Sequence, residues 1–273
     1  MKRMSAVLAF LFAAALAATS LSASKPKPAE GTTLTVFAAA SLTEPFTELG
    51  RMLESSHPGL TVRFNFAGSQ QLAAQIDQNA DADLFASADE HWMSFLVDHG
   101  KIEGEPRVFA HNELVVIVPK SNPARIQTLP EISKRGVKVV LGSPSTPIGI
   151  YSRGVLQRMG ALGLDYPSNF AERVLANVVS EEDNVKSVVT KVQIAEADAG
   201  IVYRSDVTDP VARVVRVFQI PPKAQVVANY PIAPLKSSIH GQEARAFLNL
   251  LASKEGRAVI ERYHMTVPEP DKH

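Results

Sequence analysis

The sequence contains no cysteine, so disulfide bonds and a lipid-modified N-terminal cysteine are excluded. It also has no excess of charge, because 28 basic and 28 acidic residues give a net charge of zero. The basic face that nucleic-acid binding needs is therefore not indicated, and no strong global field would attract an anion. What remains is an ordinary globular composition, 45% hydrophobic over 273 residues, which is enough chain for one large or two medium domains.

The N-terminal residues are typical of a secretory signal peptide. Lys2 and Arg3 precede an apolar run over Ala6–Ala18, and Ala23 offers a small residue for cleavage. A membrane anchor is the alternative, but the run is shorter than the ~20 apolar residues that a spanning helix needs. We predict a signal peptide over 1–23, a flexible leader over 24–31, and a mature protein exported to the periplasm.

Apolar β-branched segments and segments of helical periodicity alternate along the rest of the chain. Strands are expected at Thr32–Ala40, Leu60–Phe66, Asp83–Ser87, Leu114–Pro119, Val137–Leu141, Val174–Val179 and Gly200–Tyr203. Helices are expected at Leu42–Ser56, Ser69–Asn79, Glu90–Gly100, Ile148–Met159, Val185–Ala195, Gln242–Ala252 and Lys254–Tyr263. This rhythm predicts an α/β protein with mostly parallel sheets flanked by helices.

The alternation restarts near residue 112, which predicts two lobes. The last part of the chain, from about Ala228, has no lobe of its own and is expected to return to the first. We therefore predict a first lobe over 32–112 and 226–273, and a second lobe over 113–225. Ligands of such sheets bind outside the carboxyl ends of the strands, so we expect a cleft between the lobes.

Five segments at strand ends carry hydrogen-bond donors, and none of the expected donors is itself a Lys or Arg. Each alone fits an ordinary helix cap or a half-buried tyrosine, and the Ser41-Leu42-Thr43-Glu44 segment fits a capping box. Together they predict a local anion site, because unpaired N–H groups at helix starts attract anions. The expected donors are Ser41, Ser69, Ile148, Val185 and Tyr203.

The ordered set of motifs resembles the periplasmic molybdate- and tungstate-binding proteins of ABC importers, which have a two-lobed, type II periplasmic-binding-protein fold. The resemblance runs from about Thr32 to Thr266. The segments that carry it are AAASLTEPF, FAGSQQLAAQI, ADLFASADEHWM, TPIGIY, DNVKSVV, GIVYRSD and YPIAPL.

The resemblance implies a role for each of the five donors. Ser41 and Ser69 would each donate a hydroxyl and an amide to the oxyanion, Ile148 and Val185 a backbone amide, and Tyr203 its hydroxyl. These groups would contact molybdate oxygens rather than the metal itself. The family often has alanine where this chain has Ile148, but a backbone donor does not depend on its side chain.

The implied function is capture of molybdate or tungstate and delivery to an inner-membrane ABC permease, by a monomer without a cofactor and without catalysis. Neutral donors suit an anion that carries no proton, since a protonated phosphate would bury an O–H group without an acceptor. Two alternatives stay open: a binder of another oxyanion such as sulfate, and a secreted hydrolase with Ser41 or Ser69 as nucleophile. The histidines show no metal-ligand spacing.

Overall fold

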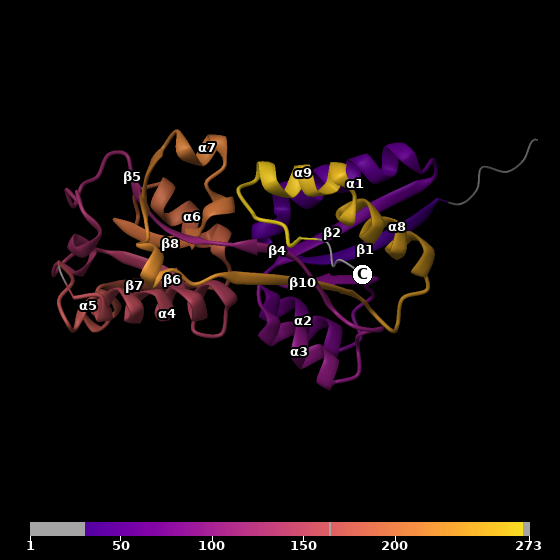
Figure 1. The fold of residues 1–273 in the computed structure, drawn as a ribbon, viewed down its shortest axis with the longest axis horizontal. Helices are drawn as coiled ribbons and strands as arrows, with labels where there is room; N and C mark the ends of the chain where they lie inside the picture. Colours follow the sequence, from indigo (N-terminus) through magenta and orange to yellow (C-terminus); the bar gives the residue numbers. More distant parts are fainter. Residues whose placement is uncertain (1–30, 164, 270–273) are drawn as a thin grey trace, which may run out of the picture. The chain divides into compact units, whose positions relative to one another are not determined.

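The structure is a computed structural model that describes residues 31–163 and 165–269. Two five-stranded sheets, each covered by helices on both faces, make up two lobes (Figure 1). The predicted signal peptide and all but the last residue of the predicted leader lie outside the described residues. Within the described part, no helix is long and apolar enough to cross a membrane.

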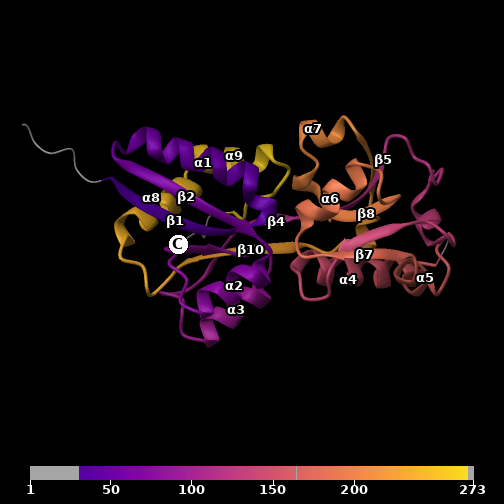
Figure 2. The same cartoon turned by 180° about the vertical axis from the view of Figure 1, so that it is seen from behind.

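The first lobe is built on a sheet of order β2-β1-β3-β10-β4. Its strands are β1 Thr32–Ala39, β2 Leu60–Ala67, β3 Leu84–Ala86, β4 Arg107–Asn112 and β10 Ala228–Pro234. Its helices are α1 Thr43–Ser56, α2 Ser69–Asp77, α3 Glu90–Asp98, α8 Gly241–Ala252 and α9 Lys254–Arg262. Helices α2 and α3 cover one face and α1, α8 and α9 the other, as the two opposite views show (Figures 1 and 2).

The second lobe is built on a sheet of order β7-β6-β8-β5-β9. Its strands are β5 Leu114–Pro119, β6 Val139–Gly142, β7 Val178–Glu182, β8 Ala199–Tyr203 and β9 Val215–Gln219. Its helices are α4 Pro147–Ala161, α5 Phe170–Ala176, α6 Val185–Gln193 and the short α7 Asp209–Ala212. Helices α4 and α5 lie on the face opposite to α6 and α7 (Figure 2).

Each sheet has one reversed strand, and the reversed strands occupy the same place in the order. β10 runs antiparallel to both β3 and β4, while β1 runs parallel to β2 and β3. In the second sheet β5 runs antiparallel to β8 and β9, while β6 runs parallel to β7 and β8. The sheets are therefore mostly parallel, as predicted, and the chain passes between them directly from β4 into β5 and again before β10.

One predicted element is wrong. The segment predicted as a strand over Val174–Val179 is helix α5 up to Ala176, and the strand β7 begins only at Val178. Phe170 and Val174, four residues apart, are both fully buried on one face of this helix, so helical spacing decides the structure there. Strands β4, β9 and β10 were not predicted. His111 and Arg216 interrupt the apolar pattern of β4 and β9, and Pro231 lies within β10.

The parallel register brings the predicted donors to one edge of each sheet. Ala39 of β1 pairs with Ala67 of β2, so Ser41 and Ser69 leave the first sheet at the same level. Gly142 of β6 pairs with Glu182 of β7, so the starts of α4 and α6 leave the second sheet together. β8, which ends in Tyr203, runs parallel to β6.

Candidate functional site

Ser41 lies in a 3₁₀ turn, η1 Ala40–Leu42, between β1 and α1. The predicted capping box is wrong, because α1 begins at Thr43 and Leu42 stands at its N-cap position without a side-chain bond. The Ser41 hydroxyl instead lies 2.9 Å from the hydroxyl of Tyr230 on β10, and both side chains are buried. The reading of Ser41 as a simple helix cap is therefore excluded.

Ser69 is the first residue of α2, and its hydroxyl also does not cap the helix. The hydroxyl oxygen accepts a hydrogen bond of 3.0 Å from the amide of Ala88, so its own proton remains free to donate elsewhere. Gly68 before it allows a close approach of the second lobe. A Cβ added to Gly68 would lie only 2.3 Å from the carbonyl oxygen of Asp183.

The second lobe contributes two helix starts. Thr146 caps α4 by accepting from the amide of Gly149 at 3.0 Å, and Pro147 occupies the first helical position, as predicted. Asn184 caps α6 by accepting from the amide of Ser187 at 3.1 Å. The amides of Ile148 and Val185 belong to the first turns of these helices, so neither has a carbonyl partner in its own helix.

Tyr203 ends β8 with a side chain that is only 1% exposed. Its hydroxyl has no hydrogen-bond partner among the described residues, although the atom is buried. Burial raises the pKa of this hydroxyl well above its usual value, so the group stays a neutral donor. A buried polar atom without a partner is rare, and here it belongs to the wall of a cavity.

All five predicted donors line one small pocket, with a cavity volume of about 20 Å³. Its wall combines them with small apolar residues and two capping side chains. The lining consists of Ala39, Ala40, Ser41, Ala67, Gly68, Ser69, Ala88, Thr146, Pro147, Ile148, Asn184, Val185 and Tyr203. None of these lining residues carries a carboxylate or a cationic side chain, so the pocket can attract an anion only through hydroxyls and helix N-termini.

Two hydrogen bonds join the lobes beside the pocket. Gln70 of α2 donates to the carbonyl oxygen of Asp183 at 2.7 Å, and the indole of Trp92 on α3 donates to the carbonyl oxygen of Ser145 at 3.0 Å. The first bond joins the start of α2 to the residues before α6, and the second joins α3 to the residues before α4. Trp92 is the single tryptophan of the chain, so its fluorescence can report this contact.

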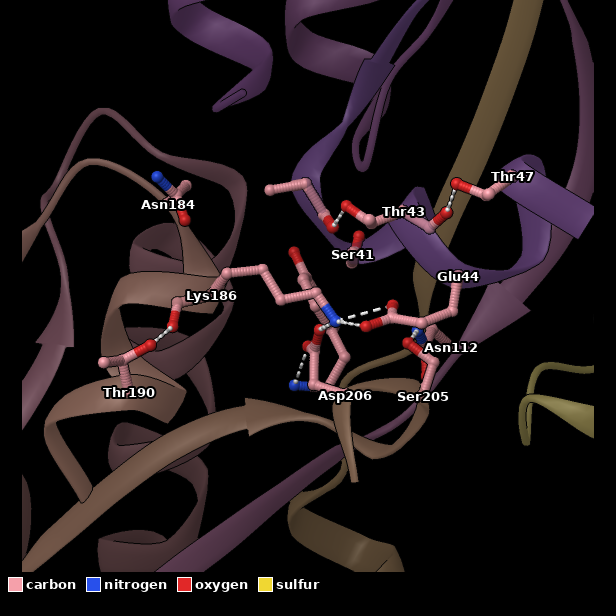
Figure 3. A network of polar contacts seen from close by, with 12 residues as sticks. Ser41, Thr43, Glu44, Thr47, Asn112, Asn184, Lys186, Thr190, Ser205 and Asp206 are labelled. Atoms are coloured by element: carbon pink, nitrogen blue, oxygen red, sulfur yellow. Dashed lines mark hydrogen bonds and ion pairs between the residues drawn. The ribbon is translucent and has the colours of Figure 1, made fainter. Parts of the chain in front are cut away.

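An ion pair also crosses between the lobes. The Nζ atom of Lys186 on α6 lies 2.7 Å from Oε2 of Glu44 on α1 and 3.2 Å from Oδ1 of Asp206 (Figure 3). This cation lies next to Val185 in the chain but is absent from the pocket lining. Its charge is balanced by two carboxylates.

Two acidic residues before α6 pair with cations and are not among the residues that line the pocket. Glu181 pairs with Arg153 of α4, and Glu182 pairs with Lys191 of α6 at 2.8 Å. His91 and His111 are not among the lining residues. The described residues contain no group of three or more His, Cys, Asp or Glu side chains placed to hold a metal ion.

The sequence reasoning missed Tyr230 and Lys186 as parts of this region. Tyr230 lies within the YPIAPL segment, but an isolated tyrosine in an apolar strand gives no signal that it contacts Ser41. Lys186 follows the predicted donor Val185, and its pairing with Glu44 spans 142 positions of sequence. Such a contact depends on how the two lobes are placed against each other, and local sequence patterns do not reveal that arrangement.

A comparison with protein families gives a match over residues 34–266 to the bacterial extracellular solute-binding proteins. The match covers nearly all of the described residues. The chain belongs to this family. The fold, with its two lobes and a pocket between them, is that of a solute-binding protein.

Two further comparisons show similarity to proteins that are named as molybdate-binding. It is 37% identical to the molybdate-binding protein ModA of Mycobacterium tuberculosis, over 88% of this chain and 87% of that protein. Among solved structures, the periplasmic molybdate-binding protein of Azotobacter vinelandii matches with a TM-score of 0.74 and 20% identity, over 86% of this chain and 100% of that chain.

The fold alone does not select the ligand. The sulfate-binding protein SubI of Mycobacterium tuberculosis matches with a TM-score of 0.77 and 17% identity, over 88% of both chains. Proteins with different ligands in their names therefore share this architecture, and the ligand has to be argued from the pocket.

Proposed function

We propose that this protein captures molybdate or tungstate in the pocket between its lobes and delivers it to the permease of an ABC importer. The observation that carries the proposal is the buried Tyr203 hydroxyl, which has no partner among the described residues and lies in a wall of neutral donors. Bound oxyanion would give that hydroxyl an acceptor. The 37% identical relative named a molybdate-binding protein supports the same ligand.

Each of the five residues has a role in this proposal. Ser41 and Ser69 donate from the first lobe through hydroxyls and amides, and Ile148 and Val185 donate backbone amides from the second lobe. Tyr203 donates its hydroxyl. All of them contact oxygen atoms of the anion, and none binds the metal directly. The N-termini of α2, α4 and α6 each add a favourable interaction between the helix dipole and the anion, worth ~0.3–1 kcal/mol.

The protonation of the ligand explains why the donors are neutral and numerous. Molybdate, tungstate and sulfate carry no proton near neutral pH, so a lining of donors can satisfy every oxygen. Phosphate keeps a proton at this pH and would bury an O–H group without an acceptor, at a cost of ~1–3 kcal/mol. The pocket therefore favours fully ionised oxyanions.

Pocket size supports a ligand of few atoms. The cavity volume of about 20 Å³ is far below the roughly 300–1,000 Å³ that is usual for sites of drug-sized ligands. Sulfate meets the same protonation requirement as molybdate but is smaller. We propose that it binds more weakly because its shorter bonds leave the donors of the two lobes too far from its oxygens.

The remaining parts of the proposal concern the whole protein. We propose that it is exported to the periplasm, works as a monomer and catalyses no reaction. In the described residues, the Ser41 hydroxyl contacts Tyr230 and the Ser69 hydroxyl contacts the Ala88 amide, so neither contacts a histidine base that would activate it. We also propose that the lobes comprise 32–112 with 226–273, and 113–225, and that they close around the anion.

A melting experiment tests the proposed ligand. A ligand that binds only the folded protein stabilises it by about 4.1 kcal/mol at a thousandfold excess over the dissociation constant. For a protein of this size, this corresponds to a rise of the melting temperature of roughly 10 °C. Molybdate and tungstate should give such rises and sulfate a smaller one. Absence of a rise with molybdate and tungstate would refute the proposal, and an equal rise with sulfate would refute selection by size.

A further inference from the structure

Behind Ser41 lies a buried tyrosine that no part of the proposed binding chemistry uses. The Tyr230 hydroxyl is fully buried on β10 and lies 2.9 Å from the Ser41 hydroxyl. The distance alone leaves open which oxygen donates, since each hydroxyl can donate or accept. The neighbouring groups settle the direction.

Asn112, at the end of β4, orients the Tyr230 hydroxyl. Its Oδ1 atom accepts from the amide of Glu113 at 3.0 Å, and an amide N–H can only donate, so the side-chain oxygen must face Glu113. The Nδ2 atom then faces the other way. It donates to Ser205 Oγ at 2.8 Å and, over a longer 3.4 Å, to the Tyr230 hydroxyl oxygen.

The direction of the remaining bond follows. Asn112 presents a donor to the Tyr230 oxygen, so it cannot accept the Tyr230 proton. That proton therefore points to Ser41, which is the other hydrogen-bond neighbour of Tyr230 among the described residues. Burial raises the pKa of Tyr230 well above its usual value, so that proton is retained. Ser41 thus accepts from Tyr230, and its own proton is left to point into the pocket that it lines.

We propose that Tyr230, held by Asn112, is a positioning residue that fixes the Ser41 hydroxyl as a donor to the anion and so lets the pocket discriminate against protonated oxyanions. This inference rests on the proposed function. Without the tyrosine hydroxyl, Ser41 could rotate and accept a hydrogen bond. A hydrogen phosphate ion would then find an acceptor for its O–H group, and the penalty against it would fall.

This chain of hydrogen bonds also connects the two lobes. Ser41 belongs to the first lobe and Ser205 to the turn that follows Tyr203 in the second. Asn112 and Tyr230 lie on the segments by which the chain passes between the sheets, β4 and β10. The donor direction of Ser41 therefore depends on contacts between the two segments that connect the lobes, β4 and β10.

Tyr230→Phe tests this role with little disturbance of packing. The ring keeps its edge contacts with Tyr203, at 5.7 Å between centroids, and with Phe109, at 6.4 Å. Asn112 keeps its bond to Ser205, so the Ser41 hydroxyl is the one buried group in this chain of hydrogen bonds that loses its partner. Tyr263→Phe is the matched control, because that hydroxyl donates to Glu48 on α1 and is not part of the pocket.

Titration calorimetry with molybdate and with inorganic phosphate should be run on the wild type, Tyr230→Phe, Ser41→Ala, the double variant and Tyr263→Phe. We expect Tyr230→Phe to bind molybdate roughly tenfold more weakly, as loss of one oriented hydrogen bond implies. The same change in the Ser41→Ala background should cost less than about twofold, because the effect acts through Ser41. The ratio of phosphate to molybdate affinity should rise at least about threefold.

The outcomes separate the inference from the proposed function. If the wild type does not bind molybdate, both fail. If the wild type binds and Tyr230→Phe binds equally well, or loses as much affinity without Ser41 as with it, the positioning role is wrong and the proposed function stands. Should Tyr230→Phe fail to fold by circular dichroism, Asn112→Ala frees the same hydroxyl to turn. It must then raise the phosphate-to-molybdate ratio, and an unchanged ratio would overturn the inference.

Discussion

Lys186 of α6 lies 2.7 Å from Glu44 of α1, and this ion pair joins helices that belong to different lobes (Figure 3). The same ammonium group lies 3.2 Å from the fully buried carboxylate of Asp206 in its own lobe. Burial by itself lowers the pKa of Lys186, but the carboxylates of Asp206 and Glu44 outweigh it, so the net shift is upward. We therefore expect separable roles for the two carboxylates: Asp206 should need the cation for folding, and Glu44 should use it to hold the lobes together.

The first prediction follows from this division. Lys186→Met leaves the Asp206 carboxylate buried without its cation and should destabilise the protein by about 3–5 kcal/mol. Glu44→Gln removes only a partly exposed partner and should cost at most about 1 kcal/mol of folding stability. Urea unfolding of both variants measures this. A similar loss in both would show that Asp206 does not depend on Lys186.

The contact between Gly68 in the first lobe and Asp183 in the second leaves no room for a side chain at Gly68. A Cβ there would lie 2.3 Å from the Asp183 carbonyl oxygen, so Gly68→Ala should hold the lobes apart and weaken ligand binding at least tenfold, while each lobe still folds. The fluorescence of Trp92, which contacts Ser145 across the cleft, should respond less to molybdate. Gly154→Ala is the control, because its nearest neighbour would be 3.8 Å away. Unchanged affinity in Gly68→Ala would mean that the closed contact is not needed for binding.

The two serine donors should behave alike in binding and differently in stability. Ser41→Ala and Ser69→Ala each remove a hydrogen bond to a charged group worth roughly 1.5–3 kcal/mol, so affinity should fall about ten- to a hundredfold. Ser69→Ala also leaves the Ala88 amide without its acceptor, which should cost a further ~1–3 kcal/mol of folding stability. Calorimetry and thermal melting of both variants check the two parts. Normal binding by both would remove these hydroxyls from the site.

The affinity for molybdate should be nearly constant between pH 6 and 8. The lining holds no histidine or other side chain that titrates in this range, and burial raises the pKa of Tyr203, which extends its neutral donor form to higher pH. The affinity should also depend weakly on salt, because the contacts are short and shielded. Calorimetry at several pH values and salt concentrations measures both. A tenfold loss from pH 6 to 8 would implicate a histidine, with His91 and His111 the first to replace.

Folding stability has a separate pH dependence at the alkaline end. The pKa of Lys186 is higher in the folded protein than its usual value of 10.5, so its contribution is complete below that value. The contribution is lost as the pH rises through the folded pKa. Stability curves above pH 10 should therefore fall more steeply in the wild type than in Lys186→Met, and parallel curves would contradict this linkage.

Much of this architecture could be read from local patterns. Strand β1 is a segment of apolar and β-branched residues, and strand β5 is a continuous apolar segment. The helix starts at Pro147 and Val185 are preceded by recognisable caps, Thr146 and Asn184. Because parallel strands end at one edge, the positions of Ser41 and Ser69 followed from the order of strands and helices. The pocket gathers all five predicted donors for this reason.

The parts that sequence did not reveal depend on contacts distant in the chain. A serine before a helix predicts a cap, yet Ser41 contacts Tyr230, 189 positions away. The sequence pattern does not reveal helix α5, because Val174 is β-branched and precedes an apolar strand. The helix forms because it buries Phe170 and Val174 on one face. At Ser41 and in α5, tertiary contacts override the local preference of the sequence.

The most direct test of the whole account is titration calorimetry of the wild-type protein with molybdate, tungstate, sulfate and phosphate under identical conditions. A pocket that holds an ion through neutral donors alone should bind molybdate and tungstate tightly and with similar affinity, sulfate more weakly, and phosphate at least about tenfold more weakly than molybdate. Phosphate binding as tight as molybdate binding, or no binding of molybdate at all, would contradict the account.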